Sequence, residues 1–284
     1  MVPLNVGSRW CEDDVRRGTL EVFFQSWKAR LDEAPGRSTS PPPFHPLSCR
    51  SCNPSPSSTP ASTPPPPLVA LVFSGPGGSE SVADGLREAA VGAELLDTLV
   101  GGTDHDVLRP EAASAFLVRA QNGDFAFALI SSPCKFFSIG ADDRPLLFSS
   151  TCPLGADPPP AQWASYVRRG RAIVQFVFDL ILALDEAGTP WVAENPASRR
   201  DKDSPAYWAD FANHGTLWDA LDSLGLRGQV EVSFVLFAYC ACGAPYQKYT
   251  TLWGSKSAEP LLNGFADLLC THKRHAKRLR GFDA

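Results

Sequence analysis

The feature that most constrains the fold is a regular alternation of short apolar runs and helical segments from Leu68 onward. The apolar runs predict strands over residues 68–72, 93–97, 125–130, 191–195 and 229–239. Segments with helical periodicity lie between them, at 79–92, 109–124, 161–188 and 207–225. Nearly continuous apolar strands that alternate with helices are typical of parallel sheets covered on both faces. The sequence therefore predicts an α/β fold with a doubly wound, mostly parallel sheet.

The longest helical segment, 161–188, has an apolar stripe and ends at Gly188, a residue type that is common just past helix ends. The stripe consists of Ile173, Val174, Val177, Leu180, Ile181 and Leu184.

The chain before this pattern divides into two parts. Residues 1–32 are predicted to form one amphipathic helix, whose role the sequence does not define. Residues 33–67 hold twelve of the 26 prolines, mixed with serine and threonine. Such a segment cannot bury enough apolar surface to offset the entropy of ordering it, so we predict a disordered linker. The folded domain is expected over residues 68–284.

Composition narrows the class of protein. Of 284 residues, 44% are hydrophobic, which is enough for a sizeable core, and the net charge of -5 argues against a surface that binds polyanions all over. No run approaches the ~20 apolar residues of a membrane span, and no secretory signal is apparent. Eight cysteines at irregular spacing are typical of reduced thiols. We expect an intracellular protein, nuclear or cytoplasmic, that does not bind a membrane.

Polar and glycine-rich residues follow several predicted strands. In open α/β sheets ligands bind beyond the carboxyl ends of the strands. The first strand is followed by residues 73–78, Phe-Ser-Gly-Pro-Gly-Gly, and the second by Asp97. Asp97 lies 22 residues past Gly75, near the ~20-residue offset at which a carboxylate holds a ribose. Cys134 and Glu194 follow two later strands. This edge therefore predicts a nucleoside site with a thiol and a carboxylate beside it.

Each of these signals also has a simpler interpretation. A glycine turn can be only a tight turn, and a single cysteine can be a small buried hydrophobe. Asp97 can cap a helix, and Asn195 can hold a turn after Glu194.

Four motifs occur along this edge in order: FSGPGG at 73–78, SPCKFFS at 132–138, AENP at 193–196 and CGAPYQKYTTLW at 242–253. Through them, residues 68–253 resemble the DNA cytosine-5 methyltransferase family, in particular its compact algal and retroelement members. The motifs correspond to the cofactor loop, the Pro-Cys nucleophile loop, the Glu-Asn-Val segment and the Gln-x-Arg-x-Arg strand of that family.

The resemblance implies a Rossmann-like class I methyltransferase fold that uses S-adenosylmethionine. Cys134 would be the nucleophile, because a thiolate is strongly nucleophilic, and Glu194 would be an acid with a raised pKa. Both must reach a base, so the base must be flipped out of the duplex or be single-stranded. Phe73 would pack on the cofactor adenine, Asp97 would bind the ribose and Asp106 the adenine amino group. The other expected cofactor contacts are Ser74, Gly75, Gly77, Gly78 and Pro133, and the expected substrate contacts are Ser138, Asn195, Gln247 and Lys248.

The chain departs from the family pattern in three motifs and in length. Lys135 replaces a glutamine, Pro196 replaces a valine, and Tyr249-Thr250 stand where a second arginine is usual. Only residues 254–284 follow the last motif, so a target-recognition region has no obvious place. Two alternatives stay open: methylation of RNA or of an amino group, and a degenerate copy that binds nucleic acid or a partner without catalysis. The expected partner is nucleic acid, with DNA favoured over RNA, and the oligomeric state is not indicated.

No metal is expected. Cys49 and Cys52 could form a zinc site with Cys270, His272 and His275, but the cysteine pair lies in the proline-rich linker and zinc needs four well-placed ligands. Two groups of basic residues could contact phosphates or could simply be solvated helix ends. They are Arg168, Arg169 and Arg171, and the tail residues Lys273, Arg274, Lys277, Arg278 and Arg280.

Overall fold

A computed structural model describes residues 67–73, 83, 86–87, 91–138, 145–244, 246–272 and 274–275. The predicted N-terminal helix at 1–32 and the predicted linker up to residue 66 lie outside the described residues. So do Ser74, Gly75, Gly77 and Gly78 of the expected cofactor loop.

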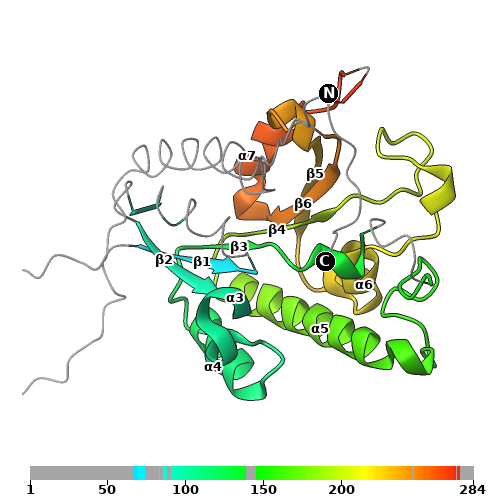
Figure 1. Ribbon diagram of the computed structural model, residues 1–284. Coiled ribbons are helices and arrows are strands. Elements are labelled where there is room, and N and C mark those ends of the chain that lie inside the picture. The colour runs from blue at the N-terminus through cyan, green and yellow to red at the C-terminus, as the bar shows by residue number, and fades with distance from the viewer. Residues whose placement is uncertain are drawn as a thin grey trace, which may run out of the picture.

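A six-stranded sheet forms the centre of the domain, with strand order β2-β1-β3-β4-β6-β5 (Figure 1). The strands are β1 (Leu68–Val72), β2 (Gly92–Leu96), β3 (Phe127–Ile130), β4 (Trp191–Pro196), β5 (Val232–Ala238) and β6 (Tyr249–Ser255). β1 is parallel to β2 and β3, and β3 is parallel to β4. β6 is inserted between β4 and β5 and is antiparallel to both. The predicted mostly parallel α/β sheet is confirmed.

Helices cover both faces of this sheet, as the apolar strands predicted. They are α3 (Thr98–Gly101), α4 (Pro110–Gln121), α5 (Ala164–Glu186), α6 (Leu217–Ser223) and α7 (Glu259–Leu262). Short 3-10 helices occupy Gly102–His105, Cys134–Phe136, Ala161–Trp163, Ala209–Phe211, Leu226–Gly228, Tyr239–Cys242, Lys256–Ala258 and Asn263–Phe265. α4, α5 and α6 lie on one face and α7 on the other (Figure 1).

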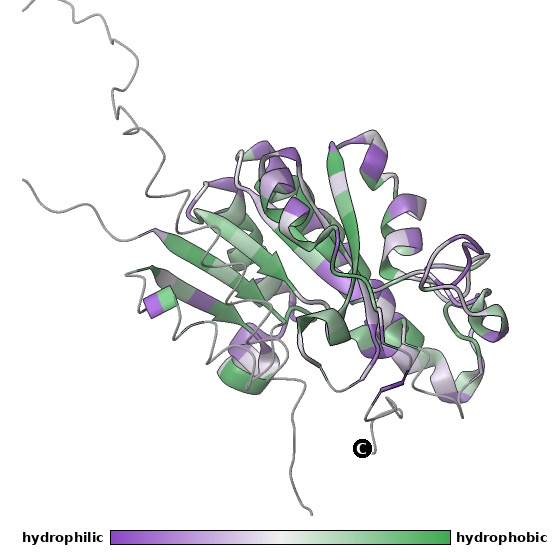
Figure 2. Ribbon diagram, turned by 90° about the horizontal axis from the view of Figure 1, so that it is seen from above, coloured by the Kyte–Doolittle hydropathy of each residue, from purple (hydrophilic) through white to green (hydrophobic). Residues whose placement is uncertain are grey.

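Side chains along each strand alternate between two cores, because successive residues of a strand point to opposite faces. In β1, Ala70 and Val72 pack in the core that includes α4, α5 and α6. Val69 and Leu71 pack in the core that includes α7. The strands are mostly apolar, whereas the helices also carry polar residues (Figure 2). All six residues of the stripe predicted for α5 are buried.

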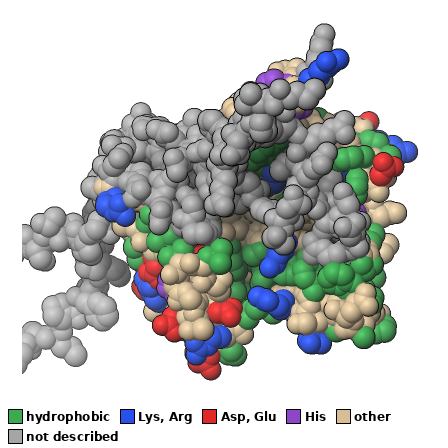
Figure 3. Space-filling view, viewed as in Figure 1, with side chains coloured by type: hydrophobic (Ala, Val, Ile, Leu, Met, Phe, Trp, Pro, Cys, Tyr) green, Lys and Arg blue, Asp and Glu red, His purple; other side chains and the backbone are tan. Residues whose placement is uncertain are grey.

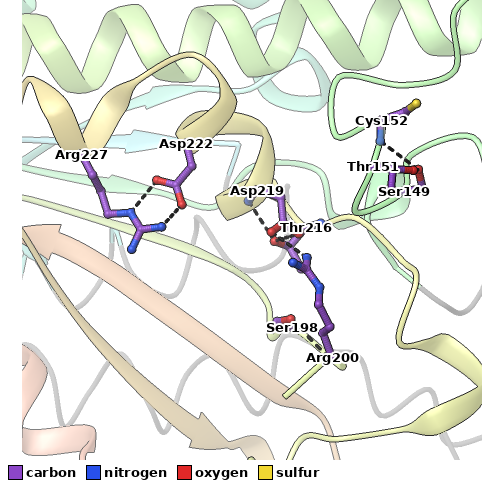
Figure 4. Close-up of polar contacts among 9 residues, drawn as sticks. All are labelled: Ser149, Thr151, Cys152, Ser198, Arg200, Thr216, Asp219, Asp222 and Arg227. Carbon is purple, nitrogen blue, oxygen red and sulfur yellow. Dashed lines mark hydrogen bonds and ion pairs between the residues drawn. The ribbon is translucent and has the colours of Figure 1, made fainter. Parts of the chain in front are cut away.

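The helix predicted over 207–225 is shorter than expected and begins only at Leu217. Thr216 starts it with a capping box, in which the Thr216 hydroxyl accepts from the Asp219 amide and the Asp219 carboxylate accepts from the Thr216 amide. Asp219 also binds Arg200, which follows β4 (Figure 4). Just before the cap, a Cβ on Gly215 would lie 2.8 Å from the carbonyl oxygen of Ser149. This close backbone contact, with the Ser149–His214 bridge, keeps the preceding residues out of the helix.

None of the helices in the described part of the chain is both long and apolar enough to cross a membrane.

The two-sided core predicts that truncating a buried leucine lowers the free energy of unfolding much more than truncating an exposed one. Leu180 on α5 is fully buried, whereas Leu99 on α3 is 73% exposed. We expect Leu180→Ala to lower the free energy of unfolding by about 2–5 kcal/mol, since it leaves a cavity. Leu99→Ala makes the same chemical change at the surface and should have little effect. Urea denaturation of both variants measures this, and equal losses would contradict the described packing.

Candidate functional site

The predicted ligand edge is also the point where the strand order reverses. β2 and β3 lie on opposite sides of β1, so the carboxyl ends of β1 and β3 mark the topological switch point, the position at which open α/β sheets bind ligands. Backbone hydrogen bonds between neighbouring segments continue just past these strand ends. The Phe73 amide donates to the Leu96 carbonyl at 3.0 Å, and the Ser131 amide donates to the Val72 carbonyl at 2.9 Å.

The loop that carries Cys134 is anchored on both sides of the thiol. Before it, the Asn195 side-chain amide donates to the Ser132 carbonyl at 3.1 Å and to the Ser132 hydroxyl at 2.9 Å. After it, the Tyr166 hydroxyl of α5 donates to the Lys135 carbonyl. Phe136 and Phe137 are buried and pack edge to face against Phe148. The half-buried Cys134 thiol therefore has a fixed position at the end of β3.

Glu194 is a buried carboxylate on the neighbouring strand β4. The Tyr239 hydroxyl donates to its Oε1 at 3.2 Å, and the Lys248 Nζ lies 3.6 Å from the same oxygen. Lys248 Nζ also lies 4.8 Å from the centroid of the Tyr239 ring. The ammonium group thus compensates a charge that would be costly to bury alone. Among the residues that the structure describes, both polar contacts of the Glu194 side chain use Oε1.

Phe73, expected to pack on an adenine, has a positive φ of 60°. Residues with a side chain rarely adopt this conformation, and backbone outliers of this kind are frequent at ligand sites. Its ring packs edge to face on Phe176 of α5, with centroids 6.0 Å apart. Phe73 therefore turns the chain sharply at the end of β1, with its half-buried ring against α5.

The two aspartates expected to bind the nucleoside both hold local backbone. Asp97 is buried and caps α3, where its Oδ1 accepts from the Leu99 amide at 2.8 Å. The simpler interpretation of Asp97 as a helix cap is thus confirmed. The Oδ1 of Asp106 accepts from the Leu108 amide at 3.0 Å, which forms a turn. These contacts leave the predicted ribose and adenine roles untested.

The expected substrate contacts separate into two groups. Asn195 and Lys248 are buried and contact the protein itself, through Ser132 and Glu194. Ser138 is half-buried at the end of the Cys134 loop, and Gln247 is exposed just before β6. Pro133 directly precedes the 3-10 helix that begins at Cys134.

Sequence reasoning missed Tyr239 and Tyr166, which position Glu194 and the Cys134 loop. The available signal for Tyr239 was its place as the first polar group after an apolar run. Sequence reasoning also did not single out Arg199, which follows β4. Burial lowers the pKa of its guanidinium group. Burial also raises the pKa of Tyr249, and burial with the neighbouring Cys270 raises that of Cys240 to about 12.

The basic residues at the start of α5 are partly used by the fold. Arg171 donates to the carbonyls of Leu154, Gly155 and Ala156 at 2.7, 3.2 and 3.1 Å. A hollow of about 660 Å³ beside it is lined by Leu154, Asp157, Arg168, Arg171, Ala172, Gln175 and Leu224. None of these residues lies at a strand end, so this hollow is not the predicted ligand site. On the described part of the face in Figure 3, Lys and Arg side chains lie singly or in small groups rather than in one basic surface.

No protein-family model and no curated protein matches the chain. Among solved structures, the chain is similar to the Entamoeba histolytica methyltransferase EhMeth, with a TM-score of 0.34 and 11% sequence identity. The match covers 67% of this chain and 53% of that one, so this chain spans about half the length of that protein. A likeness this low carries no weight for function.

The contacts of Glu194 predict that the stability of the protein depends strongly on Lys248. Both side chains are only 10% exposed, so Lys248→Met would leave a buried charge without its cation. We expect the free energy of unfolding to fall by about 3–5 kcal/mol, and the additional change Glu194→Leu to recover most of that loss. Lys256→Met removes an exposed ion pair with Glu259 and should change stability little. A double variant as unstable as Lys248→Met, measured by urea denaturation, would contradict the coupling.

Proposed function

We propose that the protein is an S-adenosylmethionine-dependent methyltransferase that acts on carbon 5 of cytosine in DNA. Cys134 is the nucleophile and Glu194 is the acid that holds the base. The observation that carries the proposal is the pair of hydrogen bonds from Asn195 to Ser132. They fix the thiol loop against the strand that carries the buried carboxylate.

The chemistry requires a thiol and a carboxyl group on one base. Carbon 5 of cytosine is a poor nucleophile. When the Cys134 thiolate forms a bond to carbon 6, the electron pair of the 5,6 double bond becomes available at carbon 5. S-adenosylmethionine, when bound, would supply the electrophilic methyl group to carbon 5 and leave as S-adenosylhomocysteine. Loss of the proton from carbon 5 then restores the double bond and expels the thiolate, so the cysteine is regenerated.

The surroundings of Glu194 suit the role of holding a base. Tyr239 and Lys248 both bind Oε1, so Oε2 is the oxygen that we assign to the base. Through that oxygen the carboxyl group can accept a hydrogen bond from the amino group of cytosine or, when protonated, donate one to ring nitrogen 3. These contacts strengthen as charge develops on the ring, which is the condition for catalysis rather than mere binding.

The described residues at the ends of β1 and β2 suit a nucleoside cofactor. Phe73 lies at the switch point in a strained conformation, and Asp97 is a buried carboxylate one strand away. In the proposal Phe73 packs on the adenine, Asp97 binds the ribose, Asp106 binds the adenine amino group and Pro133 borders the methyl donor. The glycine loop that would approach the cofactor lies outside the described residues.

One observation favours a second candidate. After β6 the described chain packs directly on the sheet, with Leu261, Leu262 and Phe265 in the core on the α7 face. No separate lobe for target recognition exists among the described residues. A protein that binds cofactor and nucleic acid without catalysis, or one that methylates RNA, is therefore the alternative, and the following experiments distinguish these cases.

Covalent trapping tests the nucleophile. The full chain should form a stable adduct with 5-fluorocytosine DNA in the presence of S-adenosylmethionine, since fluorine on carbon 5 blocks release of the thiolate. Cys134→Ser should abolish the adduct, and Cys152→Ser, which changes an exposed thiol, should leave it intact. An adduct that persists in Cys134→Ser would overturn the assignment. An adduct with RNA but not with DNA would favour the RNA alternative.

Calorimetry with S-adenosylhomocysteine tests the cofactor site separately. Asp97→Asn keeps an N-cap acceptor, because asparagine and aspartate cap helices about equally, but it removes the charge offered to the ribose. Hydrogen bonds to charged groups contribute about 1.5–3 kcal/mol, so we expect affinity to fall by roughly 10- to 100-fold. Asp104→Asn changes a carboxylate that is 89% exposed and should have no effect. Equal affinity of wild type and Asp97→Asn would remove Asp97 from the site.

A further inference from the structure

Four side chains with metal-binding atoms converge at the C-terminal end of β5. They are Cys240, Cys270, His272 and His275, and their ligand atoms all lie within 4.8 Å of one another. The Cys270 sulfur lies 3.2 Å from Nε2 of His275 and 3.9 Å from Nδ1 of His272. Around a tetrahedral zinc ion with ordinary bond lengths, ligand atoms are about 3.3–3.8 Å apart. The four groups are therefore close to the spacing that one ion needs.

We propose that Cys240, Cys270, His272 and His275 form a structural zinc site. Two thiolates and two imidazoles are the donor set that zinc favours, whereas magnesium and calcium prefer oxygen. Four protein ligands close the coordination sphere and leave no position for a substrate, which is the arrangement of structural sites. Coordination deprotonates both thiols and releases their protons, so zinc affinity should rise with pH.

The framework around these ligands is built by ordinary packing and hydrogen bonds. The Ala238 amide donates to the Leu268 carbonyl at 2.7 Å, which brings the chain after α7 beside the end of β5. Cys240 is buried in a small apolar cluster with Ala238 and Tyr249, and Cys270 packs against that cluster. Histidine side chains are visible at the top of Figure 3, over the part of the chain coloured red in Figure 1. Cys240 and Cys270 thus belong to this packed cluster, and His272 and His275 lie at its more exposed edge.

The site adjoins the proposed active site through consecutive residues. Cys240 follows Tyr239, whose hydroxyl donates to Glu194. An ion held by Cys240 would link the end of β5 to Cys270, His272 and His275. It would thereby stabilise the position of Tyr239, which orients the Glu194 carboxylate. The sequence analysis considered a zinc site of Cys49, Cys52, Cys270, His272 and His275 and expected no metal. Cys49 and Cys52 lie outside the described residues. The structure places Cys240, 30 residues before Cys270 in the chain, beside the other three.

Metal analysis of the full chain tests the proposal without any assay of methyl transfer. Protein purified under reducing conditions and dialysed against a weak chelator should hold about one zinc ion per chain, measured by plasma mass spectrometry. Cys240→Ser and Cys270→Ser should each lose most of it. Cys152→Ser and the double variant Cys49→Ser/Cys52→Ser should retain it. A strong chelator should lower the melting temperature of the wild type but not that of Cys270→Ser.

Cobalt substitution gives a readout of the ligands themselves. Cobalt in the wild-type site should show the intense visible bands of a tetrahedral ion and thiolate charge-transfer bands in the near ultraviolet. At saturating cobalt, Cys240→Ser should show about half the charge-transfer intensity of the wild type, because one of two thiolates is removed. His272→Ala, at an exposed position, should keep the charge-transfer bands but weaken cobalt binding. Circular dichroism of the variants separates loss of a ligand from loss of fold.

Three outcomes would overturn the proposal. The first is wild-type protein with no zinc and no tetrahedral cobalt spectrum. The second is zinc retained when Cys240 and Cys270 are both replaced, or lost only when Cys49 and Cys52 are replaced. The third is a Cys240–Cys270 disulfide, found by peptide mass spectrometry in protein kept under reductant.

Discussion

The site depends on two hydrogen bonds between Asn195 and Ser132, and these depend on the register of β3 and β4. Ile130 lies opposite Ala193 in the parallel pair, so Ser132 and Asn195, each two residues farther on, are level with each other. The amide can then bind both the carbonyl and the hydroxyl of Ser132. A slip of one residue would turn the Asn195 side chain to the opposite face of the sheet. Sheet register, more than loop sequence, thus sets where the Cys134 thiol lies relative to β4.

The direction of β6 has a second consequence for the same edge. An antiparallel strand begins where its parallel neighbours end, and here Thr250 pairs with Pro196 of β4 while Tyr249 pairs with Ala238 of β5. Lys248, just before β6, and Tyr239, just after β5, therefore arrive together beside Glu194. A parallel β6 would have carried Lys248 to the far end of the sheet. The buried charge of Glu194 is tolerated because this topology delivers its partners.

Thiols in this chain occupy chemically different surroundings. Cys134 lies half-buried in an anchored loop after the carboxyl end of β3, the edge at which we propose that the cytosine ring binds. Cys240 is buried in a wall of apolar side chains and faces Cys270 and two histidines. A nucleophile needs access, whereas a structural ligand needs a closed set of partners. The two proposals therefore concern separate groups that share the end of β5 through Tyr239 and Cys240.

The local pattern of apolar and polar residues was enough to predict much of the fold. Apolar periodicity predicted five of the six strands, the long helix α5 and the mostly parallel sheet. Chain order placed Asp97 and Cys134 after strands, whereas Glu194, also expected after a strand, lies within β4. Periodicity is a property of neighbouring residues, so it could not show which distant residues meet. The true start of α6 required the contact of Gly215 with the Ser149 backbone. The Tyr239 and Lys248 contacts with Glu194 required the direction of β6, and the place of Cys240 beside Cys270 required the Ala238–Leu268 hydrogen bond. Sequence determined which groups stand at the strand ends, and tertiary pairing decided which of them touch, because contact depends on strand order and direction.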